Sequence, residues 1–187
     1  MKKNYWEDLY KSNNHRSTWP WNDVVKLTKK FYKKKNKHNN NIFELGCGFG
    51  ANVPFFLKEN FNYYGIDFSS FAIKFLRTKF PSLKKRLYKS DINKFNFANL
   101  GKKFDLILDR GTVTHLKDNN INDLFSNLPK FLNNKAIVIC CSLYSDKCED
   151  RKKNKNSNYF SKGIFRGVGY INFFNKKKLN KIFTKWD

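Results

Sequence analysis

Residues 41–50 read Asn-Ile-Phe-Glu-Leu-Gly-Cys-Gly-Phe-Gly, and this stretch decides the fold. Its first half is a short apolar run with the length of a buried strand, and its second half is a cluster of glycines. Residues 52–59 favour a helix with Pro54 in the first turn, where the missing N–H has no cost. A glycine turn between a strand and a helix lets the backbone approach a ligand closely, and the free N–H groups of the helix point at the same place.

The same alternation of short apolar runs and amphipathic stretches continues along the chain. We expect strands over residues 41–46, 61–67, 87–91, 104–109 and 136–143, and helices over 52–59, 69–80, 120–132 and 175–184. Strands that are separated by helices of about ten residues pair in parallel through right-handed crossovers. The pattern therefore predicts an α/β fold with a doubly wound parallel sheet.

Length and composition set limits on the class of protein. A chain of 187 residues with 40% hydrophobic residues is one domain with a single main core. The longest apolar run, residues 136–142, is shorter than the roughly 20 residues that cross a bilayer, and the polar start of the chain predicts no secretory signal. The four cysteines, at 47, 140, 141 and 148, lack the spacing of a zinc site or a disulfide framework. We expect a cytoplasmic protein with reduced thiols, no membrane span and no metal.

The net charge of +23 has two interpretations. It is typical of proteins that bind nucleic acid or an anionic membrane surface. However, the chain has 32 Lys and 26 Asn against only 6 Arg, which is the bias that an A/T-rich genome writes into any protein. Phosphate-binding surfaces favour Arg because its planar guanidinium makes bidentate contacts. A nucleic-acid partner is thus possible but not favoured.

Acidic residues end three of the expected strands, namely Asp67, Asp91 and Asp109. In a doubly wound sheet, ligands bind beyond the carboxyl ends of the strands where the strand order reverses. Asp67 lies 67 − 46 = 21 residues after Gly46, which suits a carboxylate that accepts both hydroxyls of a ribose. The alternative for Asp67 or Asp109 is a helix N-cap. Dinucleotide-binding enzymes share these features, but their fingerprint requires glycine where this chain has Ala51.

Four segments together resemble the class I S-adenosylmethionine-dependent methyltransferases. These segments are Glu-Leu-Gly-Cys-Gly-Phe-Gly at 44–50, Tyr-Gly-Ile-Asp-Phe-Ser at 64–69, Lys-Ser-Asp-Ile at 89–92 and Phe-Asp-Leu-Ile-Leu-Asp-Arg-Gly at 104–111. The resemblance covers residues 41–143. It implies a Rossmann-like, mostly parallel sheet in the order 3-2-1-4-5 with helices on both faces, S-adenosylmethionine as cofactor and S-adenosylhomocysteine as product.

The resemblance also implies a role for individual residues. Glu44 would approach the amino group of the cofactor, Asp67 would accept from the ribose, and Asp109 would face the methionine end and the methyl acceptor. Asp91 would accept from the adenine amine while Ile92 packs on the ring. The cofactor-binding residues expected in this way are Trp6, Glu44, Gly46, Cys47, Gly48, Asp67, Phe68, Asp91, Ile92 and Asp109.

Three residues at and after the fourth strand are the candidates for catalysis: Asp109, Arg110 and His115. His115 lies where this fold places the acceptor, and its ordinary pKa suits a general base. Its alternative is a surface or capping histidine. Arg110 would pair with a carboxylate or phosphate of the substrate, or instead with Asp109 or Asp91.

The segments outside the core are expected to enclose the site. We divide the single domain into an N-terminal helical lid (1–40), a cofactor-binding core (41–143), a substrate loop (144–174) and a C-terminal helix (175–187). The Trp-rich start resembles the lid of thiopurine and tellurite-resistance methyltransferases, and its alternative is aromatic packing of a helix on the sheet. The resemblance implies two more strands after the fifth, which we expect to be missing here. Either the fold is minimal, or the chain is truncated, or a partner, such as a second copy, covers the open sheet edge.

The resemblance implies methyl transfer from S-adenosylmethionine to an O, N or S atom of a small-molecule acceptor. Strand four lacks the Asp/Asn-Pro-Pro-Tyr/Phe motif of enzymes that methylate amino groups of nucleic acids, which disfavours a DNA base. Two alternatives stay open: an RNA or protein methyltransferase, and a cofactor-binding module without catalysis.

Overall fold

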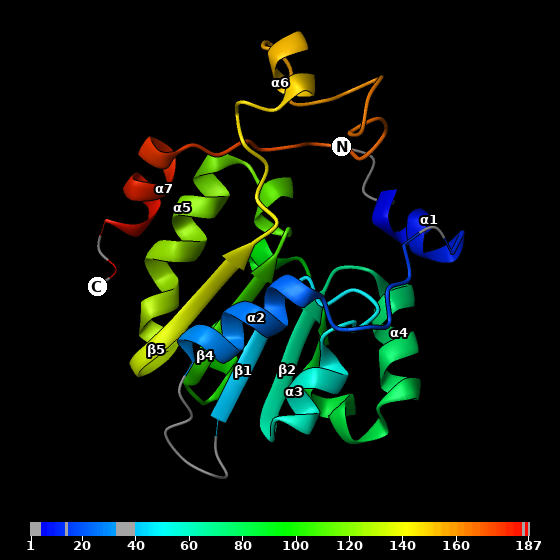
Figure 1. The fold of residues 1–187 in the computed structure, drawn as a ribbon. Helices are drawn as coiled ribbons and strands as arrows, with labels where there is room; N and C mark the ends of the chain where they lie inside the picture. The colour runs from blue at the N-terminus through cyan, green and yellow to red at the C-terminus, as the bar shows by residue number, and fades with distance from the viewer. Residues whose placement is uncertain (1–4, 14, 33–39, 185, 187) are drawn as a thin grey trace.

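The computed structural model describes residues 5–13, 15–32, 40–184 and 186. Five parallel strands form one sheet in the order β3-β2-β1-β4-β5, which confirms the expected doubly wound α/β fold (Figure 1). The strands are β1 (Asn40–Leu45), β2 (Phe61–Asp67), β3 (Leu87–Lys89), β4 (Phe104–Arg110) and β5 (Leu132–Cys141). The order reverses at β1, because β2 follows on one side of it and β4 lies on the other.

Helices cover both faces of the sheet, as expected (Figure 1). Successive side chains of a strand point to opposite faces, so neighbouring apolar residues such as Ile42 and Phe43 enter different cores. One core packs against α2 (Asn22–Phe31), α3 (Val53–Lys58) and α4 (Ser70–Lys79). The other packs against α5 (Asp118–Asn127), α7 (Lys176–Phe183) and the 3-10 turn Phe97–Leu100.

Two short helices lie beyond the carboxyl ends of the strands, α1 (Tyr5–Lys11) and α6 (Glu149–Lys153) (Figure 1). The chain between 144 and 174 has little regular structure, yet it forms a small apolar cluster of its own. The buried members of this cluster are Phe160, Phe165, Ile171 and Phe173. The carboxyl end of the sheet therefore lies beneath α1 and the 144–174 segment (Figure 1).

Some boundaries differ from the sequence predictions. The helix expected over 120–132 ends at Asn127, continues as the 3-10 turn Leu128–Phe131 and gives way to β5 at Leu132, four residues before the expected strand. Pro129 explains the early end, since it cannot donate the hydrogen bond that an α-helix needs there. The pairing of β5 with β4 then shifts register, and Lys135 adopts a φ of 58° within the irregularity.

The sheet ends at β5, because no strand of the described residues pairs with its outer edge. The expectation that a second copy covers this edge stays a prediction. The division of the domain into four segments also stays a prediction, and parts of its first and last segments, residues 1–4, 14, 33–39, 185 and 187, lie outside the described residues. No helix in the described part of the chain is long and apolar enough to span a membrane.

Candidate active site

The glycine turn after β1 is the centre of the candidate site. Gly46, Gly48 and Gly50 have φ values of +64°, +50° and +72°, in the left-handed region where a Cβ is strained. A Cβ on Gly46 would lie 2.0 Å from Oγ1 of Thr112, and one on Gly48 would lie 2.8 Å from the hydroxyl of Tyr10. The side chain of Cys47 is buried in the core beneath the turn. Glycine is therefore required at 46 and 48 by close neighbours from two other segments.

Glu44 lies inside the sheet below this turn, and both of its carboxylate oxygens have partners. Nδ2 of Asn52 donates to Oε1 at 2.7 Å, and the hydroxyl of Tyr63 donates to Oε2 at 2.5 Å. Burial raises the pKa of Glu44 to about 7. These bonds tie β1 to β2 and to the start of α3, so Glu44 shapes the turn. Its approach to the amino group of a cofactor stays a prediction.

Asp67 joins the glycine turn to the end of β2. Its Oδ2 accepts from the Gly48 N–H at 2.9 Å, and its Oδ1 accepts from the Ser69 N–H at 2.8 Å. The side chain is 6% exposed, and burial raises its pKa to about 6. The N-cap of α4 is Ser69, whose hydroxyl accepts from the Ala72 N–H, so the N-cap interpretation of Asp67 is wrong. The next side chain, Phe68, is 38% exposed beside it.

Asp109 lies at the end of β4 and is fully buried. Its Oδ1 accepts from the Val113 N–H at 3.1 Å, whereas Oδ2 has no hydrogen-bond partner among the described residues. Burial raises the pKa of Asp109 to about 7. In the β1–β4 register, Asp109 pairs with Leu45, the residue before Gly46. A buried carboxylate oxygen without a partner is costly. The role of Asp109 at the methionine end of a cofactor stays a prediction.

Asp91 and Ile92 follow the carboxyl end of β3, on the same side of the molecule as the ends of β1, β2 and β4. Oδ1 of Asp91 accepts from the backbone N–H of Asn93 at 3.0 Å and from Nδ2 of Asn93 at 2.9 Å, which caps a short 3-10 turn. Ile92 is half-buried against the core. The Ser90 N–H donates to the Asp67 carbonyl, so the pair lies close to the end of β2. Their contact with an adenine ring stays a prediction.

Helix α1 lies over the glycine turn and is anchored there by Glu7. The Glu7 carboxylate accepts from the hydroxyls of Ser69 and Ser70 and from the Phe71 N–H, at 2.5, 3.0 and 3.3 Å. These bonds lower the pKa of Glu7 although burial acts in the opposite direction. Sequence reasoning selected Trp6 and missed both Glu7 and Tyr10. Trp6 and Tyr10 are four residues apart, a spacing that places both on one face of a helix. This spacing could have identified Tyr10 from the sequence.

His115 faces α1 from the loop after β4. The centroids of its ring and of the Trp6 ring are 5.0 Å apart, and its Nδ1 lies 3.1 Å from the carbonyl oxygen of Tyr170. Burial lowers the pKa of His115 to about 4. At neutral pH the ring is therefore uncharged, with the Nδ1 proton donated to Tyr170 and Nε2 left unprotonated. This is the protonation state of a base, and its catalytic role stays a prediction.

Arg110 contacts Asp23 of α2 and Trp21, the residue that precedes this helix. Its Nε lies 3.3 Å from Oδ1 of Asp23, and its guanidinium carbon lies 3.6 Å from the centroid of the Trp21 ring. The alternative by which Arg110 pairs with Asp109 or Asp91 is therefore wrong. No local pattern points to Asp23 as the partner, because it lies 87 residues away along the chain. Pairing of Arg110 with a substrate stays a prediction and requires it to exchange this partner.

No cluster of three or more metal-ligating side chains occurs within the described residues, and their four cysteines are free. The candidate site therefore consists of a glycine turn, the ends of β1, β2 and β4 with their carboxylates, and aromatic and histidine side chains from α1 and the loop after β4.

Comparison with known proteins agrees with this arrangement. Residues 43–138 match the model of a family described as methyltransferase domain. A S-adenosylmethionine-dependent methyltransferase from Clostridium acetobutylicum ATCC 824 is 14% identical with a TM-score of 0.62, covering 98% of this chain and 80% of that chain. TehB from Haemophilus influenzae is 17% identical with a TM-score of 0.63, covering 97% and 56%. DesVI from Streptomyces venezuelae is 16% identical with a TM-score of 0.54, covering 80% and 56%.

At these identities the solved structures establish a shared fold. The chain spans only about half of the length of TehB and DesVI, since 56% of each is covered. No curated protein matches the sequence.

Proposed function

Since the chain belongs to the class I S-adenosylmethionine-dependent methyltransferases, we propose that it transfers a methyl group to an oxygen, nitrogen or sulfur atom of a small molecule. The observation that carries the proposal is the unpartnered Oδ2 of Asp109, which is fully buried beside the glycine turn at the point where the strand order reverses. Doubly wound sheets bind ligands at that point.

The cofactor is S-adenosylmethionine. In the proposed complex, Asp67 accepts from the ribose hydroxyls with the lone pairs that its two backbone bonds leave free. The exposed ring of Phe68, with Ile92 and Asp91, forms the adenine side of the site. Asp109 faces the methionine end, where its free oxygen gains a donor.

The chemistry required from the protein is modest. When bound, S-adenosylmethionine supplies a sulfonium methyl group that is already activated toward nucleophiles. The chain must orient the acceptor in line with it and exclude water. Trp6 and Tyr10 cover the turn from α1 and perform the second task. His115, uncharged and with Nε2 unprotonated, removes a proton from an acceptor that has one to lose.

The surroundings of His115 support a small, uncharged acceptor. The ring of Trp6 packs against His115, and Arg110 at the end of β4 is paired with Asp23 and covered by Trp21. A phosphate-rich acceptor would need free cations at this position. We therefore place neutral thiols, phenols and amines ahead of RNA as substrates.

Thermal unfolding of the full chain tests the cofactor site. S-adenosylmethionine, S-adenosylhomocysteine and NAD are each added at about a hundred times a plausible dissociation constant, where binding adds about 2.7 kcal/mol and raises the midpoint by roughly 5 to 10 °C. We expect a shift with the two S-adenosyl compounds and none with NAD. Absence of a shift with both S-adenosyl compounds would contradict the proposal.

Methyl transfer is then measured by mass spectrometry with panels of thiols, phenols and amines, and separately with RNA. Formation of S-adenosylhomocysteine together with one methylated small molecule supports the proposal. Methylation of RNA alone, with steep salt dependence, would overturn the small-molecule assignment in favour of a nucleic-acid substrate. Cofactor binding without turnover on any panel would instead identify a binding module.

A further inference from the structure

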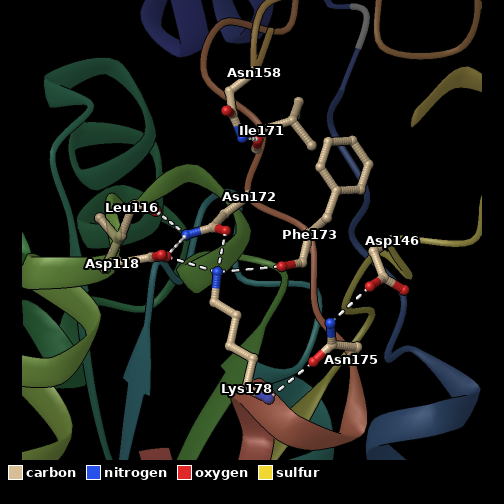
Figure 2. A network of polar contacts seen from close by, with 9 residues as sticks. All are labelled: Leu116, Asp118, Asp146, Asn158, Ile171, Asn172, Phe173, Asn175 and Lys178. Atoms are coloured by element: carbon tan, nitrogen blue, oxygen red, sulfur yellow. Dashed lines mark hydrogen bonds and ion pairs between the residues drawn. The ribbon is translucent and has the colours of Figure 1, made fainter. Parts of the chain in front are cut away.

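A buried asparagine connects the 144–174 segment to the loop that carries His115. Asn172 is 3% exposed, and its backbone N–H donates to the Thr114 carbonyl at 2.6 Å. Its Nδ2 donates both protons, to the Leu116 carbonyl at 2.8 Å and to Oδ1 of Asp118 at 2.7 Å. Figure 2 shows the amide nitrogen of Asn172 pointing toward Leu116 and Asp118, which lie to its left in this view.

Lys178 of α7 completes the arrangement from the other side. Its Nζ donates to Oδ1 of Asn172 at 2.5 Å, to Oδ1 of Asp118 at 2.6 Å and to the Phe173 carbonyl at 3.2 Å (Figure 2). The amide of Asn172 thus has both donors and its acceptor satisfied. A fully satisfied buried amide admits one orientation, because rotation by 180° would place donor against donor.

The two carbonyls that hold Asn172 belong to Thr114 and Leu116, the residues on either side of His115. Two residues before Asn172, the Tyr170 carbonyl accepts from Nδ1 of His115 at 3.1 Å. Asn172 therefore bonds to the backbone on both sides of His115. The same segment places the Tyr170 carbonyl against Nδ1 of the ring, and this bond selects the tautomer of His115.

The other groups around His115 do not take over this task. Trp6 meets the ring through an edge contact, and His15, whose own pKa is lowered by burial, contributes to the lowering of the pKa of His115. Within the segment itself, the Ile171 N–H donates to the Asn158 carbonyl, and because it shares a peptide plane with the Tyr170 carbonyl, it orients that carbonyl within the segment. Asn172 instead fixes the segment to the loop that carries His115. Among the described residues, the Tyr170 carbonyl is the hydrogen-bond partner of the ring.

We propose that Asn172 is a positioning residue, which locks the 170–172 backbone onto the loop after β4 and so keeps Nε2 of His115 free to act as the base. The significance for turnover rests on the proposed function, whereas the control of the His115 tautomer does not. Asn172 itself touches neither cofactor nor acceptor in this assignment.

Nuclear magnetic resonance of the full chain labelled with 15N-histidine tests the proposal without any acceptor. In the wild type we expect the ring shifts of a single Nδ1–H tautomer at pH 7. Asn172→Ala removes the side-chain bonds to the Leu116 carbonyl and to Asp118 and keeps the backbone bond to Thr114, so the Tyr170 carbonyl is held less firmly against the ring. We therefore expect a mixture of tautomers or a protonated Nε2. A His115 ring that keeps the pure Nδ1–H signature in a folded Asn172→Ala protein would overturn the proposal.

Asn175→Ala is the matched control. Asn175 belongs to the same set of polar contacts, and its side chain bonds to Asp146 and to the Lys178 N–H (Figure 2). The variant weakens the hold on the 144–174 segment and on the start of α7, but its bonds go to neither neighbour of His115. We expect its His115 ring to keep the wild-type tautomer. A tautomer change equal to that of Asn172→Ala would show a general loosening and would contradict the specific role.

A second variant covers the case in which Asn172→Ala does not fold. Lys178→Met removes the donor to Oδ1 of Asn172 and keeps the apolar stem, so the tautomer should shift in the same direction but less. No shift in Lys178→Met would then overturn the proposal.

Turnover separates this inference from the proposed function. With an acceptor in hand, a lost tautomer should reduce kcat by about 10- to 100-fold and leave the affinity for S-adenosylhomocysteine unchanged. A changed tautomer with unchanged kcat would keep the positioning role and remove His115 from the chemistry. If the protein transfers no methyl group to any acceptor, the proposed function fails, and the tautomer measurement still decides whether Asn172 positions His115.

Discussion

Replacement of Asp109 by Asn should stabilise the protein at alkaline pH while weakening its cofactor site. The carboxyl is fully buried, and burial raises its pKa from 3.8 to about 7. An acid whose pKa is higher in the folded state contributes its full stability below the pKa of the unfolded chain, and this contribution is lost as pH rises through the folded pKa. The ionised form of Asp109 therefore destabilises the fold progressively from about pH 4 to pH 7.

The size of the effect follows from the shift. Three pKa units correspond to about 4 kcal/mol at pH 8 and to under half of that at pH 5. Asn keeps the bond from the Val113 N–H, but it places an amide without a partner where Oδ2 lay, which costs about 1–3 kcal/mol at every pH. The variant should match the wild type near pH 5 and exceed it by about 1–3 kcal/mol at pH 8, or roughly 3 to 8 °C in Tm.

Thermal unfolding of both proteins from pH 5 to pH 8.5 measures this difference. Glu44 and Asp67, whose pKa values are also raised, are present in both proteins. The difference between the two curves of Tm against pH therefore isolates the contribution of Asp109. A gap in Tm that does not widen with pH would refute the reasoning. The S-adenosylmethionine-induced shift should be smaller in the variant, since the free oxygen is lost.

Asp105 provides the matched control on the same strand. It lies at the opposite end of β4, and its two oxygens accept from the Asn41 N–H and from Nδ2 of Asn133, both at 2.9 Å. Asp105→Asn places an amide against one of these donors and should lower Tm, with the S-adenosylmethionine-induced shift retained. A gain in Tm at pH 8 similar to that of Asp109→Asn would show that the effect is general to acidic residues in this basic protein.

Four further variants test the rest of the site. Gly46→Ala should destabilise the protein by about 1–3 kcal/mol in thermal unfolding, since its Cβ would lie 2.0 Å from Oγ1 of Thr112 at a φ of +64°; an unchanged Tm would contradict the geometry of the turn. Asp67→Ala should abolish the thermal shift with S-adenosylmethionine, and an undiminished shift would remove Asp67 from the site. His115→Ala should lower kcat by about 10²- to 10⁴-fold without a change in cofactor affinity; because its pKa is about 4, wild-type turnover should lose this contribution only as pH falls through that value, and a midpoint near pH 6.5 would show that the ring is not buried as described. Glu7→Gln should lower Tm by roughly 2 to 6 °C at pH 7, since it weakens bonds worth about 1–2 kcal/mol; the lowered pKa of Glu7 means that this difference should vanish as pH falls below that pKa, and a difference that persists in acid would argue against the ionised anchor.

Local sequence patterns predicted the sheet because each strand carries its own signal. The run before Gly46 and the apolar stretches ending at Asp67 and Asp109 are short, uninterrupted and followed by turn residues, so their type and order followed from the chain alone. The same local information placed the glycine turn, Asp67 and Asp109 at the carboxyl ends of neighbouring parallel strands, where the structure has them.

Contacts between distant segments could not be predicted in this way. The partner of Arg110 is Asp23 on α2, and its selection depends on how that helix packs beside β5. The sequence predicts an N-terminal helical lid, and its described part divides into α1 and α2, with Trp19 and Pro20 in the irregular stretch between them. Asn172 had no distinguishing neighbours in a chain with 26 asparagines, and only the fold shows that it is buried.

The separate apolar cluster of the 144–174 segment has a consequence for how such a protein changes over evolution. Phe160, Phe165, Ile171 and Phe173 pack on one another rather than into the two cores that flank the sheet. Substitutions or insertions between these residues therefore leave the packing of the strands intact. The segment is bonded through Asn172 to the loop after β4 and to Lys178 of α7. If it is the substrate loop that the sequence predicts, changes within it would alter acceptor preference and leave the glycine turn unchanged.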